Sequence, residues 1–115
     1  MENLKKKDVT IESFTNLNIV LGTILTASNN EKAKIPAYIL SIDFGNVIGV
    51  KVTSAQITNY TLDDLIDKQV VAICNLPSKN IAGFTSEVLI LGAISRDETT
   101  LLQIEKKLKN GTLIG

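Results

Sequence analysis

Three segments in the first half of the chain alternate hydrophobic and polar positions with a period of two, which predicts β-strands. They cover residues 19–26, 37–44 and 48–55. In the first segment, Gly22 marks a place where the strand could bend or another group could approach the backbone closely. Gly45-Asn46 favours a turn between the second and third segments, so we expect those two to form a hairpin. One face of the second segment carries four large apolar side chains, Tyr38, Leu40, Ile42 and Phe44.

Two further apolar runs, at residues 70–74 and 88–91, are short and rich in β-branched side chains, as expected of buried strands. The loop between them, residues 75–87, mixes amide, hydroxyl, ammonium and carboxylate groups around a glycine. It also contains Ile81 and Phe84, which we expect to be exposed. Because binding groups concentrate on loops held by rigid strands, we treat this unit as the centre of the candidate site.

Two short segments have a helical period instead. Residues 10–17 place apolar side chains at intervals of three, with Thr10 or Asp8 as the cap. Residues 61–66 begin with a capping-box pattern, a threonine followed three residues later by an aspartate. The apolar side chains expected to cover a surface or face inward are Ile11, Phe14 and Leu17 in the first segment and Leu62, Leu65 and Ile66 in the second.

The order of these elements predicts the fold. Five strands with one short helix between the third and fourth strands is the plan of an OB-fold, an all-β Greek-key barrel whose face and loops bind oligonucleotides or other extended ligands. A sixth short strand at residues 99–104 and a tail at residues 105–115 would lie outside the minimal barrel. We predict a polar leader at residues 1–9, either solvated or a basic arm touching RNA, and a single domain at residues 10–115 with an N-terminal helix and a C-terminal extension.

Composition constrains the partners and the compartment. The chain has 115 residues, 44% of them hydrophobic, and its 12 basic and 12 acidic side chains cancel. A net charge of zero gives no overall attraction to a polyanion, so any nucleic-acid site has to be local. The single cysteine, Cys74, excludes an intramolecular disulfide and suits a reducing compartment as a buried, inert thiol. We expect a cytoplasmic protein without membrane insertion, because no segment is long and apolar enough to span a bilayer or to serve as a signal peptide.

The residue types needed for common catalytic sites are missing. The sequence contains no histidine, the commonest general base and the commonest neutral metal ligand. Asp63, Asp64 and Asp67 have the wrong spacing for a calcium loop. The glycines do not cluster as a phosphate-binding loop. We therefore expect a binding protein and no enzyme, with no cofactor and no metal.

Several motifs occur in a specific order along the chain. They include Ile35-Pro36-Ala37-Tyr38, Ile42-Asp43-Phe44-Gly45, Ser54-Ala55-Gln56-Ile57-Thr58, Ile81-Ala82-Gly83-Phe84, Ser86-Glu87-Val88-Leu89 and Asn110-Gly111-Thr112. In order and spacing they resemble the CsaA-type secretion chaperones, which belong to the wider tRNA-binding domain family. The resemblance implies an OB-fold homodimer that holds unfolded or pre-export polypeptides. For the wider family it implies tRNA binding.

The resemblance also implies roles for individual residues in the groove and at the subunit contact. Polypeptide binding is expected of Tyr38, Pro77, Ile81 and Phe84. Binding of tRNA is expected of Lys51, Ser54, Gln56, Asn75, Lys79, Ser86 and Glu87. Dimer contacts through the N-terminal helix and the tail are expected of Phe14, Leu108, Leu113 and Ile114.

Each group of candidate residues also has a structural alternative. Tyr38 could belong to the core, Phe84 could plug the barrel end, and Asn75 could simply bond the loop. Residues 54–58 could satisfy backbone groups at the end of the third strand. The dimer residues could instead pack within one subunit.

Departures from the family pattern favour a polypeptide over tRNA as the ligand. Leu76 and Asn80 stand where the family tends to have an aromatic and a basic residue, and each lost phosphate contact weakens binding to a polyanion. Aromatic residues make up only 4% of the chain, so few side chains can stack on bases. In the tail, Lys106, Lys107 and Lys109 could restore a local basic patch.

Overall fold

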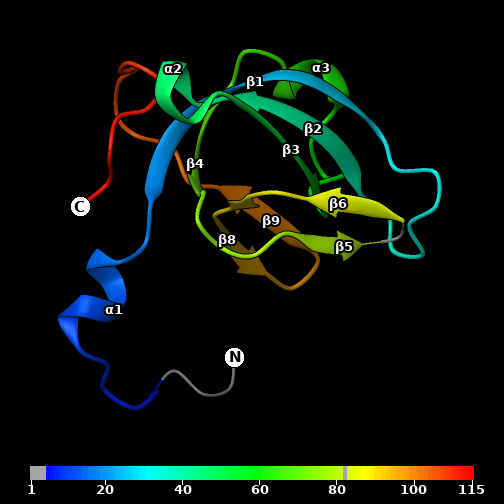
Figure 1. Ribbon diagram of the computed structural model, residues 1–115. Helices are drawn as coiled ribbons and strands as arrows, with labels where there is room; N and C mark the ends of the chain where they lie inside the picture. The colour runs from blue at the N-terminus through cyan, green and yellow to red at the C-terminus, as the bar shows by residue number, and fades with distance from the viewer. Residues whose placement is uncertain (1–4, 82) are drawn as a thin grey trace.

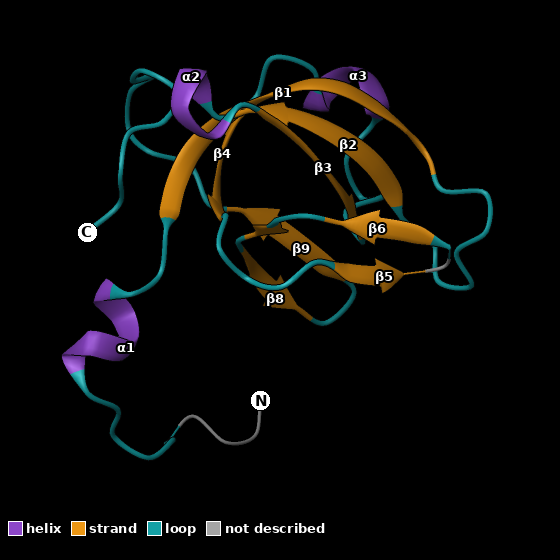
Figure 2. Ribbon diagram, in the orientation of Figure 1, coloured by secondary structure: helices purple, strands orange, loops and turns teal. Residues whose placement is uncertain are grey.

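The computed structural model describes residues 5–81 and 83–115, and its main element is a five-stranded antiparallel sheet curled into a nearly closed barrel (Figure 1, Figure 2). The strand order is β3-β2-β1-β4-β7. The strands span Ile19–Asn29 (β1), Tyr38–Asp43 (β2), Val50–Ala55 (β3), Gln69–Ile73 (β4) and Leu89–Ile90 (β7). The predicted all-β OB-fold barrel and the β2–β3 hairpin are confirmed.

The predicted apolar face of the second segment points into the barrel and contributes to its core. Its side chains Tyr38, Leu40 and Ile42 on β2 and Phe44 directly after it are all buried. The Phe44 ring lies against Gly22, where an added β-carbon would be 2.5 Å from Cδ1 of the ring. The predicted close approach at Gly22 is therefore confirmed, and the absence of a side chain there lets the ring cross β1.

Within residues 5–81 and 83–115, three short helices accompany the barrel: α1 (Ile11–Thr15), α2 (Gly45–Ile48) and α3 (Leu62–Leu65). In α3 the amide of Asp64 donates to Oγ1 of Thr61 at 3.1 Å, as predicted, and Leu65 is buried in the core. The expectation that Ile66 faces inward is wrong, because the backbone is already extended at Ile66 and the side chain is 38% exposed. Among the described residues, no helix is both long and apolar enough to cross a membrane.

Several boundaries differ from the sequence predictions. Residues 45–48 form one helical turn, so β3 begins at Val50 and not at residue 48. The segment 75–87 is not a simple loop, because it contains a hairpin of Lys79–Ile81 (β5) and Phe84–Ser86 (β6). The sixth strand is Glu98–Leu101 (β9), which pairs with an unpredicted strand, Gly92–Ser95 (β8).

The C-terminal tail returns to the barrel and runs along β1. The amides of Gly111 and Ile114 donate to the carbonyl oxygens of Leu21 and Ile19, each at 2.8 Å. Ile114 also packs on a second apolar cluster that includes Ile19, Leu21 and Val71. The tail therefore covers a strand edge and an apolar surface that the barrel alone would leave open.

Candidate functional site

Two segments far apart in the sequence meet at one end of the barrel, and we call them the rim. They are residues 30–37, between β1 and β2, and residues 76–81 with 83–86, which contain the β5–β6 hairpin (Figure 1). A β-carbon placed on Gly83 would lie 3.5 Å from Cδ of Lys32, so the hairpin tip lies against the loop. The rim is therefore a continuous surface made by two chain segments.

Asn30 holds the first of these segments in place. This buried side chain donates from Nδ2 to Oγ of Ser54 on β3 at 3.3 Å, and its Oδ1 accepts from the amide of Lys32 at 3.3 Å. The backbone amide of Asn30 donates to the carbonyl oxygen of Ala37 at 2.9 Å, which closes the loop. The loop is thus fixed to β3.

The side chains presented by the rim combine positive charge with apolar surface. Lys32, Lys34 and Lys79 are exposed. Two isoleucines accompany them, with Ile35 62% exposed and Ile81 36% exposed. Ammonium groups bind phosphates or carboxylates, while exposed isoleucines gain from covering apolar groups. Such a surface suits an extended polymer that carries both kinds of group.

The rim includes several predicted residues and three that sequence reasoning missed. Lys79, Pro77 and Ile81 are exposed on it as expected, and Phe84 is half-buried on β6. The missed residues are Lys32, Lys34 and Ile35. The available signal was the alternation of basic and apolar residues between the first two strands, where OB-folds carry a ligand-binding loop.

Ser86 and Glu87 close the barrel between β6 and β3. The amide of Ser54 donates to Oγ of Ser86 at 2.9 Å, and the amide of Val52 donates to Oε1 of Glu87 at 2.9 Å. The amide of Glu87 donates in turn to the carbonyl oxygen of Val52 at 2.8 Å. These contacts give both side chains a structural role between β6 and β3. Their expected contacts with tRNA stay a prediction.

Two of the predicted groove residues, Tyr38 and Gln56, differ in their burial. Tyr38 is buried, and its hydroxyl donates to the carbonyl oxygen of Tyr60 at 2.9 Å, as its core alternative requires. Gln56 is exposed directly after β3. Of the two, only Gln56 presents its side chain to solvent.

Lys51 is half-buried on β3 and acts on the Cys74 thiol. Burial raises the pKa of Cys74 to about 11, and the nearby Lys51 ammonium opposes that rise. A thiol with a raised pKa stays protonated at neutral pH and is a poor nucleophile. This agrees with the expectation of an inert thiol. The expectation that Cys74 is buried is only partly right, because the residue is half-buried.

The candidate dimer residues fall into two groups. Phe14 on α1 is 40% exposed, and Leu113 in the tail is 65% exposed. Leu108 is also exposed. Ile114 is different, because it packs on the apolar cluster of its own subunit. For that residue, packing within the subunit accounts for the apolar side chain.

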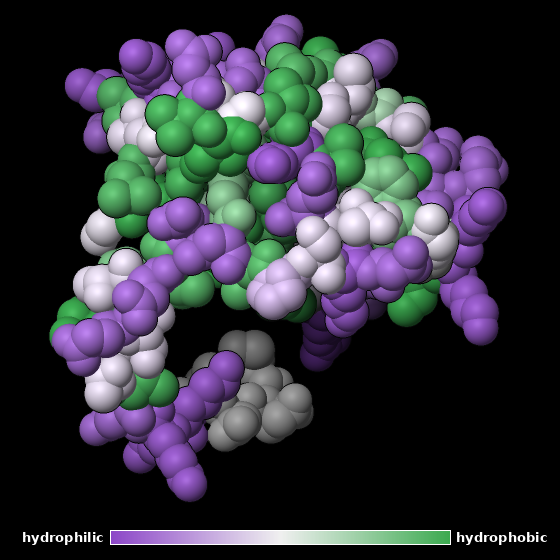
Figure 3. Space-filling model, in the orientation of Figure 1, coloured by the Kyte–Doolittle hydropathy of each residue, from purple (hydrophilic) through white to green (hydrophobic). Residues whose placement is uncertain are grey.

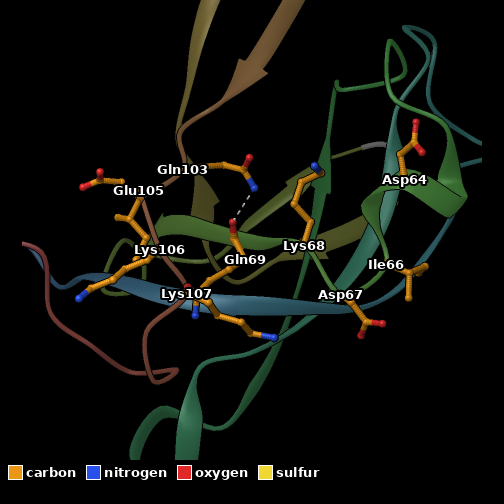
Figure 4. Close-up of a pocket in the computed structure, with 10 residues that line it drawn as sticks. Asp64, Ile66, Asp67, Lys68, Gln69, Gln103, Glu105, Lys106 and Lys107 are labelled. Carbon is orange, nitrogen blue, oxygen red and sulfur yellow. Dashed lines mark hydrogen bonds between the residues drawn. The ribbon is translucent and has the colours of Figure 1, made fainter.

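A polar pocket of about 390 Å³ lies between the α3–β4 turn and the tail (Figure 4). Its charged lining consists of Asp64, Asp67 and Lys68 on one side and Glu105, Lys106 and Lys107 on the other. Three acidic and three basic groups surround the same space, so their charges cancel. The tail lysines Lys106 and Lys107 therefore do not create a net positive pocket.

Comparison with known proteins identifies the family. The family model of the tRNA binding domain matches residues 19–113. The crystal structure of the CsaA chaperone from Picrophilus torridus is similar with a TM-score of 0.89 and 44% identity, covering 94% of this chain and all of that chain. CsaA from Bacillus anthracis gives a TM-score of 0.89 and 43% identity, covering 95% of this chain and all of that one.

Similarity extends to much longer proteins. Methionine--tRNA ligase of Methanococcus vannielii is 31% identical over 110 residues, which cover 96% of this chain. The matched region is only 16% of the length of that ligase. The match to the family model over nearly the whole chain is decisive: the chain belongs to the tRNA-binding domain family.

Proposed function

We propose that this chain is a non-enzymatic, cytoplasmic, chaperone-like protein that holds unfolded or pre-export polypeptides at the rim and works as a homodimer. The observation that carries the proposal is the pairing of exposed Ile35 and Ile81 with three lysines at one end of the barrel. The 43–44% identity to two proteins named CsaA chaperone supports it.

The rim chemistry suits an unfolded chain. Such a chain offers apolar side chains that a folded protein would bury, and isoleucines at the rim can cover them. Lysines can pair with carboxylates of the same segment, and exposed pairs of this kind contribute little affinity. Binding of this type is weak and tolerant of sequence, as holding many different clients requires.

Support for a homodimer comes from apolar side chains that one subunit leaves uncovered. Phe14 projects from α1, which buries no residue, and Leu113 projects from the tail. Since a small domain gains stability by hiding such surface, a second copy is the proposed partner. The rim lies elsewhere on the molecule, so both contacts are compatible.

The polypeptide proposal is tested by replacing both rim isoleucines. We expect an Ile35→Ser, Ile81→Ser variant to suppress aggregation of an unfolded client about tenfold less well, because losing about 1.4 kcal/mol of apolar contact lowers affinity tenfold. The measurement is light scattering of a chemically unfolded client as it is diluted into increasing concentrations of the protein.

The matched control is Val47→Ser on α2. Val47 is 100% exposed, so the change removes the same kind of apolar surface away from the rim. We expect this control to protect the client like the unaltered protein. Equal protection by the rim variant and the unaltered protein would rule out the rim as the polypeptide site.

A second candidate function is tRNA binding, favoured by the three rim lysines contributed by two separate segments. We expect a Lys32→Ala, Lys34→Ala, Lys79→Ala variant to reduce the slope of log affinity against log salt by about 2, because each phosphate contact to a single strand contributes about 0.7. The measurement is titration of tRNA at several salt concentrations.

The control for charge is a Lys68→Ala, Lys106→Ala, Lys107→Ala variant. It removes the same number of positive charges from the pocket, where acidic groups offset them. We expect its salt slope to match that of the unaltered protein. Absence of tRNA binding even at low salt would eliminate the second function, and a larger loss in the pocket variant would move the RNA site away from the rim.

A further inference from the structure

Residues 9–17 form a projecting segment that we call the arm. Its helix, α1, has no buried residue, and it stands clear of the barrel (Figure 1, Figure 3). The arm exposes Val9, Ile11 and Phe14. A helix of five residues has too few internal bonds to persist alone in water, so contacts outside the helix have to hold it.

The side chain of Asn75 supplies two such contacts from the end of β4. Its Nδ2 donates to the carbonyl oxygen of Asn16 at 2.7 Å, and its Oδ1 accepts from the amide of Asn18 at 2.7 Å. Asn16 is the C-cap of α1, where helix carbonyl oxygens lack partners within the helix. Asn75 therefore caps α1 and fixes the first residue before β1 with the same amide group.

The neighbouring backbone strengthens this clamp. The amide of Cys74 donates to the carbonyl oxygen of Asn18 at 2.8 Å, which extends the β1–β4 pairing by one residue. Leu17 packs on the apolar cluster of the barrel. The path from α1 to β1 is thus held on both sides, although the helix beyond it contacts little of its own subunit.

We propose that Asn75 is a positioning residue that sets the direction of the arm so that its apolar side chains meet a second copy of this chain. The inference rests on the proposed homodimer and deepens it. It also gives Asn75 a structural role beside the expected contact with tRNA, because both polar atoms of its side chain have backbone partners. Only an amide offers a donor and an acceptor together in this geometry.

The surface beside the root of the arm indicates why the partner is a second copy. Leu113 pairs with Val20 at the start of β1, and the arm joins β1 at the same end. The exposed apolar arm and the exposed Leu113 therefore both belong to the end of the barrel at which β1 begins. A two-fold contact requires such a self-complementary surface, with the arm of each subunit over the tail of the other. A net charge of zero adds no overall repulsion between copies.

The test compares Asn75→Ala with the unaltered protein by sedimentation equilibrium over a wide range of concentrations. We expect the dimer dissociation constant to rise about 10-fold to 100-fold, because a freed arm has to be ordered again in both subunits when they associate. Asn75→Asp keeps the acceptor for Asn18 but places a carboxylate oxygen against the carbonyl oxygen of Asn16 at the C-terminus of α1, so we expect a rise at least as large.

The control is Asn80→Ala, which removes another exposed asparagine, whose Oδ1 accepts a hydrogen bond from the nearby amide of Gly83. We expect its dissociation constant to be unchanged. Hydrogen exchange of the Asn18 amide, measured in dilute monomer, should be faster in Asn75→Ala, while the thermal midpoint of the barrel stays nearly the same.

The outcomes separate the inference from the homodimer itself. If the unaltered protein is a monomer at all concentrations, both the homodimer and the positioning role of Asn75 are overturned. If it is a dimer and Asn75→Ala dissociates no more readily, the homodimer stands and the positioning role is overturned. A variant that keeps its dimer but loses tRNA binding would likewise overturn the inference in favour of an RNA contact.

Discussion

Replacing Gly22 with alanine is expected to lower the free energy of unfolding by about 3 kcal/mol, the upper end of the cost of overpacking a core. The new β-carbon would lie 2.5 Å from Cδ1 and 2.6 Å from Cε1 of Phe44, and 2.7 Å from Cγ2 of Ile42. Both neighbouring side chains are buried, and the close packing of a protein interior resists their displacement. Urea unfolding followed by circular dichroism measures the change.

Two further variants identify the Phe44 ring as the cause. In a Phe44→Leu background, the Gly22→Ala change should cost at least about 1 kcal/mol less, because neighbours that clash are not additive. Gly83→Ala is a control for backbone strain without a clash, since its φ is +76° and the nearest atom to a new β-carbon is 3.5 Å away. We expect it to cost about 1 kcal/mol. A smaller cost for Gly22→Ala than for Gly83→Ala would contradict the packing argument.

Gly22 also illustrates what the sequence can predict about this fold. The alternation in β1 and β2 reports burial on one face of a sheet, and a glycine in such a strand marks a close approach. The sequence could not name Phe44 as the group that approaches. The strands β5, β6 and β8 were missed because most of their residues are exposed, so the sequence shows no alternation of buried and exposed positions there.

The sequence predicted which polar residues lie near the candidate site, but it did not predict which groups their side chains contact. Ser86, Glu87 and Asn75 are polar residues near a loop, which suggested ligand binding. Their partners are backbone groups of β3 and of the segment before β1, between 32 and 59 residues away in the sequence. Pairings at such separations depend on the register of the closed barrel, which local sequence does not reveal.

Lys32 and Lys34 are the opposite case, because the sequence analysis did not predict a binding role for them. Turn-forming residues at 28–32 predict a simple connection. A turn pattern does not show which other segment of the chain the turn contacts. Only the contact between Lys32 and the hairpin tip at Gly83 makes this loop part of the rim. The rim therefore emerges from the fold, although each of its two segments is visible in the sequence.

Replacing Gln69 with alanine is expected to lower the free energy of unfolding by about 2 to 4 kcal/mol and to release the tail first. Nε2 of this buried side chain donates to the carbonyl oxygen of Leu108 at 2.7 Å and to Oδ1 of Asn110 at 3.1 Å. Its Oε1 accepts from the amide of Leu108 at 3.2 Å. The same Asn110 oxygen accepts from Oγ1 of Thr23 at 2.7 Å, so the variant weakens a connected buried network.

Release of the tail can be distinguished from unfolding of the whole barrel by comparing proteolysis with circular dichroism. When the tail leaves β1, trypsin should cut after Lys109 in the variant at urea concentrations where circular dichroism still reports a folded barrel. Gln103→Ala is the matched control, because that side chain donates one bond of 3.2 Å to the carbonyl oxygen of Gln69 and is exposed. We expect it to cost less than about 1 kcal/mol. If cleavage and loss of the barrel signal coincide in Gln69→Ala, the tail is an integral part of the barrel, because the two then unfold as one cooperative unit.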